Sequence, residues 1–334
     1  MSHKRVVRRR WMWLIGSVVA TSLLAIVFNS VDWARVWQEV RRVHFGWLAL
    51  AVAFNLSIIA LWTKQWSVFL PRKQKVGYRT MFETVALMAM VSNALPYMIG
   101  QASGVLLLAK RGKVGHAIGL SVLALDQLAE GLAKLSVLAV VALLIPIPPW
   151  LRQGILLLVS VVLTLLVTLL WFAHRHREPT KPLDHAKASL SRRILHFGSR
   201  WAHHLEALRS VKVFGAGLGL ALAMKAAEAA AILAVQQSFG IELPLWSVLL
   251  VLISVGIVTM VGVVPGNLGV YEATVFFVYQ YVGASPEQAL GLAVIQHVCY
   301  LIPLAGTGYL FVVAQNFRRR KDQSLGRSGL AEDT

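Results

Sequence analysis

Acidic residues and cysteine are both scarce in this sequence. Only 14% of its residues are charged and only 15 are Asp or Glu, whereas roughly 25% of residues are charged in soluble domains. Because so few charges would not keep a chain with 57% hydrophobic residues in solution, we expect a polytopic membrane protein. The single cysteine, Cys299, lies in an apolar run. This excludes a disulfide framework and a thiolate metal site.

Other absences narrow the function further. The net charge of +18 lies in loops and tails, which indicates membrane topology rather than nucleic-acid binding. The sequence has no nucleic-acid recognition motif, no ATP-binding motif, and no arginine inside an apolar run. Many histidines lie in the basic loop 174–212, without a nearby cysteine, so we interpret them as solvated rather than as metal ligands. We expect no metal and no cofactor.

Apolar runs and basic loops together predict an all-α membrane domain with six full spans and two broken, re-entrant helices. The predicted full spans are 11–28, 44–70, 114–145, 153–173, 213–238 and 289–316, and the broken segments are 81–109 and 247–281. The run 11–28 follows a basic start but no A-x-A-like cleavage site, so we interpret it as an uncleaved anchor rather than a signal peptide.

The positive-inside rule predicts both termini in the cytoplasm. The basic cluster 110–113 stays cytoplasmic only if 81–109 is a re-entrant hairpin; eight simple spans would place it outside. The basic loop 174–212 contains an apolar period at 190–208, which predicts an amphipathic helix on the anionic inner leaflet. A basic tail, 317–334, follows the last span.

Tryptophans close to the ends of the predicted spans suggest an interfacial belt. They are Trp11, Trp13, Trp47, Trp62, Trp66, Trp150 and Trp171.

The two broken segments resemble each other. In each segment a glycine follows a proline by four positions. The pair is Pro265 and Gly269 in TMVGVVPGNLGVYE (259–272), and Pro96 and Gly100 in VSNALPYMIGQAS (91–103). A polar residue follows each proline by seven positions, Ser103 or Glu272. We interpret 44–145 and 213–316 as an internal repeat, inverted because one hairpin enters from each side. Such breaks at membrane depth recur in transporter binding sites.

Charged residues inside apolar spans mark functional sites by default. Asp126, Glu130 and Lys134 share one face of a helix because they are four apart. We expect one polar cavity at the repeat interface, with half-helix N-termini at Asn267 and near Gly100 attracting a phosphate. The candidate substrate-binding residues are Asn93, Pro96, Gly100, Ser103, Asp126, Glu130, Lys134, Lys225, Glu228, Pro265, Gly266, Asn267, Gly269, Glu272 and His297.

Structural roles remain open for the same residues. The charges can neutralise one another as buried pairs, above all Lys225 with Glu228. Glu272 can cap a half-helix, since carboxylates favour N-termini. The prolines and glycines are architectural in either case.

Three motifs carry a family resemblance: VVPGNLGVYE, the VGASPEQAL that follows it, and the N-LP-x3-G pattern from Asn93 to Gly100. With them the chain resembles the lysylphosphatidylglycerol synthase transmembrane-domain (flippase-like) family over roughly 44–316. The resemblance implies a stand-alone form without the synthase domain, so we expect no aminoacyl transfer. This chain departs from the family pattern at several positions. Relatives commonly have an acidic residue and an arginine near the positions of Gln101 and Gly104, a Glu-Arg pair at the positions of Asp126 and Gln127, and an arginine at the position of His297.

The leading hypothesis is a non-enzymatic translocase of a lipid or lipid-linked precursor, whose head group passes through the polar cavity. The second is a membrane-embedded enzyme acting on a polyprenyl or phospholipid head group. The third is a non-catalytic partner in a membrane-lipid synthesis complex, which the resemblance connects with hopanoids. The expected partners are membrane lipids, the anionic inner-leaflet surface, and either a second copy or lipid-synthesis enzymes; no nucleic acid is expected.

Overall fold

The computed structural model describes residues 31–144, 148–175, 205–261 and 264–329, and within these ranges it contains helices and no strand. The α-helices are α2 (Trp33–Arg41), α3 (Phe45–Phe69), α4 (Tyr78–Ala94), α5 (Tyr97–Gly112), α6 (His116–Leu144), α7 (Arg152–Arg175), α9 (Glu206–Arg209), α10 (Val211–Ser238), α11 (Trp246–Val261), α12 (Val270–Tyr281) and α13 (Pro286–Gly329). Short 3-10 turns lie at η1 (Pro149–Leu151) and η2 (Pro265–Asn267).

Five helices of the described part are long and apolar enough to cross a membrane: Phe45–Phe69, His116–Leu144, Arg152–Phe172, Val211–Ser238 and Pro286–Phe317. They agree with five of the predicted full spans. The chain is therefore a multi-pass membrane protein. The predicted first span, 11–28, and the predicted amphipathic helix, 190–208, lie outside the described residues, except for the last few positions of that helix.

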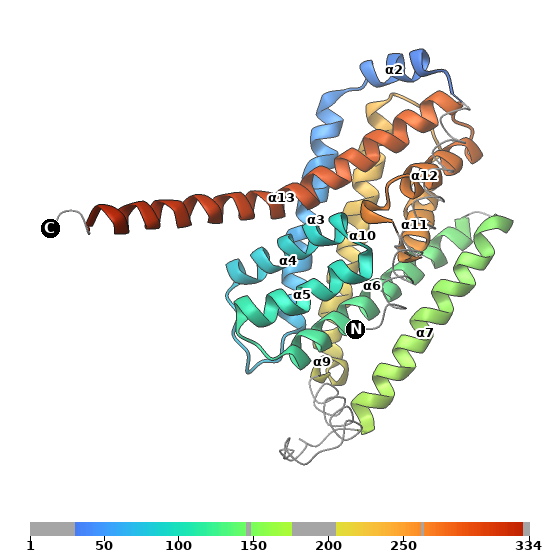
Figure 1. Cartoon of the computed structure of the whole chain (residues 1–334). Coiled ribbons are helices and arrows are strands. Elements are labelled where there is room, and N and C mark those ends of the chain that lie inside the picture. The colour runs from blue at the N-terminus through green and yellow to red at the C-terminus, as the bar shows by residue number, and fades with distance from the viewer. Residues whose placement is uncertain (1–30, 145–147, 176–204, 262–263, 330–334) are drawn as a thin grey trace, which may run out of the picture.

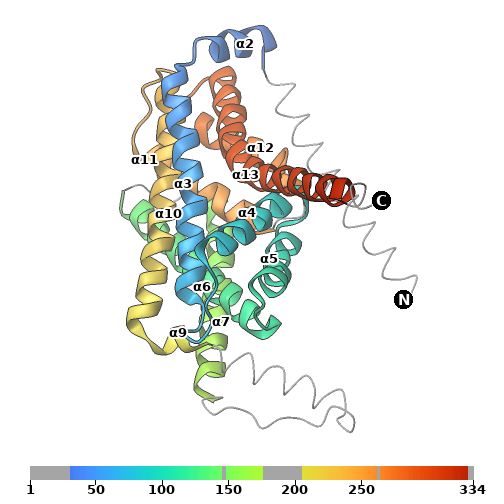
Figure 2. The same cartoon turned by 90° about the vertical axis from the view of Figure 1, so that its left-hand side faces the viewer.

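The long helices α3 and α10 lie side by side (Figures 1 and 2), along one side of the bundle as Figure 2 shows. Gln65 of α3 donates a hydrogen bond of 3.0 Å to the carbonyl of Gly217 in α10, and the ring of Phe69 in α3 packs on Gly217. The close approach depends on the small size of Gly217, because a Cβ there would overlap the Phe69 ring. α4 and α13 pack against α3, and α6 packs against α10.

Each broken segment forms two helices that pack against each other. The first consists of α4 and α5, which meet where Leu95 adopts an extended backbone before Pro96. The second consists of α11 and α12, joined through η2. Both breaks lie at the prolines that the sequence singled out, because proline removes an amide donor and clashes with a preceding helical turn.

The last helix is longer than the sequence predicted. The predicted span ends at 316, and the apolar part of the helix ends close to it, at Phe317, but α13 continues to Gly329 and its end projects beyond the other helices (Figure 1). It also runs through Pro303 without ending. The apolar pattern marks where a span leaves the membrane, and not where a helix stops; Arg, Lys and Gln are good helix formers in water.

Candidate functional site

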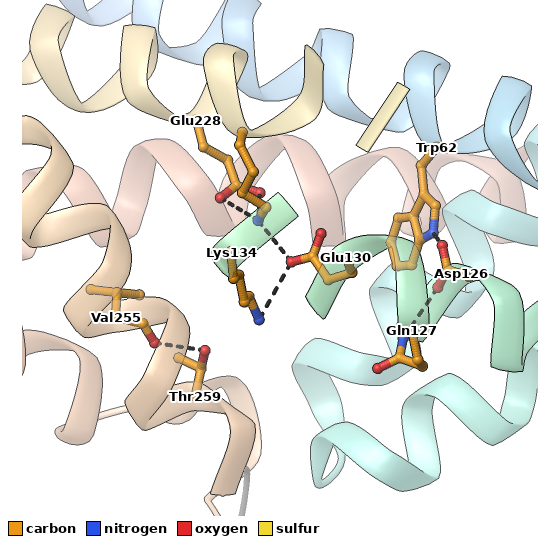
Figure 3. Close-up of polar contacts among 9 residues, drawn as sticks. Trp62, Asp126, Gln127, Glu130, Lys134, Glu228, Val255 and Thr259 are labelled. Carbon is orange, nitrogen blue, oxygen red and sulfur yellow. Dashed lines mark hydrogen bonds and ion pairs between the residues drawn. The ribbon is translucent and has the colours of Figure 1, made fainter. Parts of the chain in front are cut away.

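An ion network of four charged side chains joins α6 to α10. Lys225 of α10 lies 2.7 Å from Glu130 of α6 and 2.7 Å from Glu228 of its own helix. Lys134 completes the network at 3.4 Å from Glu130. Figure 3 shows these contacts, with Lys134 between Glu130 and the helix that carries Thr259. The network brings two lysines against two glutamates, so it is close to neutral.

The predicted pairing of Lys225 with Glu228 is present, but it is only part of this network. Lys225 is 6% exposed, and a buried ammonium group is tolerated only when it is paired and hydrogen-bonded. Of its two partners, Glu228 is three residues away in the same helix, whereas Glu130 belongs to the other predicted repeat. The network therefore links the two predicted repeats at their interface.

Lys134 is the most weakly held member of the ion network. Its single ion-pair partner among the described residues is Glu130, and the 3.4 Å separation is longer than the Lys225 contacts. Its side chain lies along α11, where a Cβ on Gly256 would be 3.4 Å from its Cε. Lys134 thus connects α6 with the second broken segment.

Asp126 lies one helical turn before Glu130 but belongs to a different set of contacts. Its carboxylate accepts a hydrogen bond of 2.9 Å from the indole Nε1 of Trp62 and one of 3.1 Å from Nε2 of Gln127 (Figure 3). Asp126 is 3% exposed, so neutral donors from α3 and α6 surround a buried acidic group.

The two breaks touch each other. η2 packs against α4, and a Cβ on Gly266 would lie 3.0 Å from the backbone oxygen of Asn93. The Asn93 side chain donates 2.9 Å to the carbonyl of Ala89 within α4, so its backbone is the part that faces Gly266. The motifs that the sequence treated as equivalent thus meet in space, and Pro96 and Pro265 interrupt the two helices beside this contact.

Substituting Gly266 with alanine is expected to destabilise this contact by about 1–2 kcal/mol, because Gly266 has φ +60°. The added Cβ would also press on the Asn93 oxygen at 3.0 Å. Thermal unfolding of the purified protein in detergent measures the change. Asn267→Gly is the matched control, since Asn267 has φ +53° and glycine accepts that conformation. Equal unfolding temperatures for Gly266→Ala and wild type would contradict this local geometry.

Glu272 caps α12. Its carboxylate accepts 2.6 Å from the backbone N–H of Gly269, which has φ +82° and precedes the helix. The predicted cap is therefore present, but the helix begins at Val270, so the predicted N-terminus at Asn267 is wrong. Asn267 and Gly266 have left-handed backbones that cannot continue into a helix. The other predicted start, near Gly100, is close, because α5 begins at Tyr97.

Glu272 also contacts His297 of α13. The Nδ1 of His297 lies 2.6 Å from a carboxylate oxygen of Glu272, and Tyr271 stacks on the imidazole with 4.1 Å between ring centroids. Tyr271 in turn accepts a hydrogen bond of 2.8 Å from Gln296. His297 and Asp126 thus have unlike partners.

Ser103 has no part in either charged cluster. Its hydroxyl donates to the carbonyl of Gly100 within α5 at 2.5 Å. Gly100 itself packs directly on the backbone of Ser92 in α4. Both residues therefore serve the packing of the first broken segment, and the predicted parallel between Ser103 and Glu272 does not extend to their contacts.

The contacts of two tryptophans in α3 differ from those that the sequence predicts. Trp62 and Trp66 were assigned to the interfacial belt, but this is wrong: Trp66 is fully buried and Trp62 binds Asp126. Trp47 and Trp171, by contrast, are 42% and 53% exposed, as the belt predicts. The four-residue spacing of Trp62 and Trp66 was the available signal, because it places both indoles on one face of α3.

No group of three or more His, Cys, Asp or Glu gathers as a metal-ligand set within the ranges that the structure describes. Of the basic-loop histidines considered as metal ligands, His174 lies in the last turn of α7, and His176, His203 and His204 lie outside these ranges.

Comparison with known families gives one match that covers most of the chain. The family model described as the lysylphosphatidylglycerol synthase TM region matches residues 13–308. The matched range contains the paired helices α3 and α10, both broken segments, the ion network, and the contacts of Asp126 and Glu272. The search among curated proteins found no match.

Proposed function

Because the chain belongs to the family of the lysylphosphatidylglycerol synthase TM region, we propose that it moves a lipid or lipid-linked precursor between the leaflets of the bacterial inner membrane. Family membership supports a role connected with membrane lipids. The translocase activity, the absence of catalysis, and the membrane itself are our proposals.

The proposed topology has both termini in the cytoplasm and treats 44–145 and 213–316 as inverted repeats within a single membrane domain. The packing of the helices supports it. α6 of the first repeat packs on α10 of the second, and α13 of the second packs on α3 of the first. The first broken segment, α4 and α5, would enter from the cytoplasm, and α11 and α12 from outside. Exchanged contacts of this kind are expected from two halves related by an axis in the membrane plane.

One observation carries the proposal: the two breaks contact each other through Gly266 and Asn93, at the interface of the proposed repeats. Transporters commonly bind substrate at such interrupted helices near the bilayer midplane. The ion network and Asp126 lie on α6 and α10, which pack on each other. A polar head group would pass along these side chains while its tails remain in lipid.

Each candidate side chain has a proposed role in that path. The N-terminus of α5 would stabilise a phosphate through the helix dipole, whereas that of α12 is already capped by the Glu272 carboxylate. Lys134 would approach the same phosphate, because it is held only at 3.4 Å. Glu130, Lys225 and Glu228 would hold the two repeats in register.

Leaflet exchange in proteoliposomes tests the proposal. Purified protein would be assayed with fluorescent phosphatidylglycerol, aminoacylated, glycosylated and polyprenyl-linked lipids. We expect exchange of one lipid class, and a several-fold slower rate for Glu272→Gln, which weakens the His297 contact. The exposed Glu242 provides the matched control, Glu242→Gln, which should exchange at the wild-type rate. Absence of exchange for every lipid would refute a translocase and favour the enzyme or partner hypotheses.

A further inference from the structure

Two carboxylates on one face of α6 are held in opposite ways. Glu130 lies against two lysines, at 2.7 Å and 3.4 Å. Asp126 is held by an indole and an amide at 2.9 Å and 3.1 Å, and no Lys, Arg or His nitrogen of the described chain forms an ion pair with it. Glu130 therefore has a permanent counter-charge, whereas the charge of Asp126 has none.

Because Asp126 is buried, its lack of a counter-charge has a large energetic cost. Asp126 is 3% exposed on a helix that is long and apolar enough to span the membrane. A buried carboxylate without a counter-charge is costly, and inside a membrane it marks a functional group. Uptake of a proton removes the charge without a change in packing. Hydrogen-bond donors lower the cost of the charged form but do not abolish it, so both protonation states are accessible.

A second indole lies on the same helix as Trp62. Trp66 follows it by four residues, so both indoles lie on one face of α3, which packs on α6. Trp66 is fully buried, and its Nε1 has no hydrogen-bond partner among the described residues. The face of α3 that binds Asp126 through Trp62 thus also carries a neutral donor that is unused in this conformation.

We propose that Asp126 is the site of an exchangeable proton that couples lipid movement to the proton gradient. The proposal rests on the translocase function for its coupling, but proton binding can be measured without any lipid. In the uptake step a proton leaves hydronium and forms an O–H bond with one carboxylate oxygen. In the release step that bond breaks and water receives the proton. No oxidation or reduction takes place.

Gln127 suits both states of this site. Its amide donates through Nε2 to the carboxylate at 3.1 Å. After rotation of the amide, its Oε1 would accept the proton of the carboxylic acid, because an amide offers both a donor and an acceptor. A lysine at this position would instead keep the carboxylate charged.

The other titratable groups near Asp126 are engaged elsewhere. On α6, Glu130 and Lys134 bind each other, and α10 contributes Lys225 and Glu228, which belong to the same network. α5 contributes the phenol of Tyr97, and α3 contributes only the neutral indoles at this face. α11, which also packs on α6, has no titratable residue. Glu272 of α12 is already held by the cap N–H and His297.

Infrared difference spectroscopy of the purified full-length protein tests proton binding directly. We expect a carboxylic-acid carbonyl band that disappears reversibly as pH rises, is absent in Asp126→Asn, and persists in Glu242→Gln. An unchanged band in Asp126→Asn would overturn the proposal, as would the lack of any such band in wild type. If Asp126→Asn does not fold, Asp126→Glu should shift the band in frequency. Trp62→Phe should move its disappearance to higher pH, because the carboxylate loses a donor.

Exchange assays then test the coupling. With fluorescent phosphatidylglycerol, or whichever lipid class exchanges, a pH gradient should accelerate wild-type exchange, and in Asp126→Asn the rates with and without the gradient should become equal. If the wild-type exchange rate is the same with and without the gradient, the proposed coupling is wrong, but the translocase function is still supported. An Asp126 band without exchange of any lipid would have the opposite meaning: the proton site would stand and the translocase function would fail.

Discussion

Replacing Lys225 with methionine is expected to destabilise the folded protein by about 3–5 kcal/mol, because the partly buried Glu130 and Glu228 lose their shared, buried counter-charge. Methionine keeps much of the side-chain volume, so the change removes the charge rather than the packing. Thermal unfolding in detergent, together with the yield of monodisperse protein, measures the effect. We expect a large loss of both.

The control for this substitution comes from the same helix. Lys212 is exposed at the start of α10, and Lys212→Met should change stability little. Combining Lys225→Met with Glu228→Gln should recover part of the loss, because Glu130 keeps Lys134 as its counter-charge and no unpaired charge remains in the network. A Lys225→Met protein as stable as wild type would show that the ion network does not contribute to the folded state.

Gly100→Ala is expected to have the second large effect, and it acts on the first broken segment. The new Cβ would overlap the backbone of Ser92, so α4 and α5 would have to separate. Overpacking typically costs about 1–3 kcal/mol, and here the obstacle is the backbone of a helix rather than a flexible side chain. We also expect lipid exchange to fall to background, because α4 carries the contact with η2.

Gly219→Ala is the matched helical control. Gly219 lies within α10, and a Cβ there would meet nothing within 4 Å. Alanine favours a helix over glycine by up to about 1 kcal/mol, so this variant should be equal to or more stable than wild type. If Gly100→Ala unfolds at the same temperature as Gly219→Ala, the close packing of α4 on α5 is wrong.

Much of the fold could be predicted from local sequence. The apolar runs predicted the five long described helices, because a span must satisfy every backbone polar group within itself. Pro96 and Pro265 predicted the breaks, since proline lacks the amide donor that a continuous helix needs. Charges in apolar runs predicted which residues would need partners, and Glu272 was correctly weighed as a cap.

The partners themselves depended on packing between distant segments. Glu130 pairs with Lys225, and Asp126 with Trp62, across separations that no local rule connects. The start of α12 at Val270 depends on the left-handed backbones of Gly266 and Asn267, which a motif does not reveal. The length of α13 depends on helix propensity beyond the membrane rather than on hydropathy.

Local sequence thus predicts a helical membrane protein, the places where its helices break, and the charged residues in apolar spans that need compensation. Those properties follow from hydrophobicity and backbone chemistry within a few residues. The contact between the two breaks, the neutralisation of Glu130 by lysines, and the lack of a counter-charge at Asp126 emerge only when the helices pack. Compensation of a buried charge depends on which side chains packing brings within about 4 Å, and that distance is set by the whole bundle.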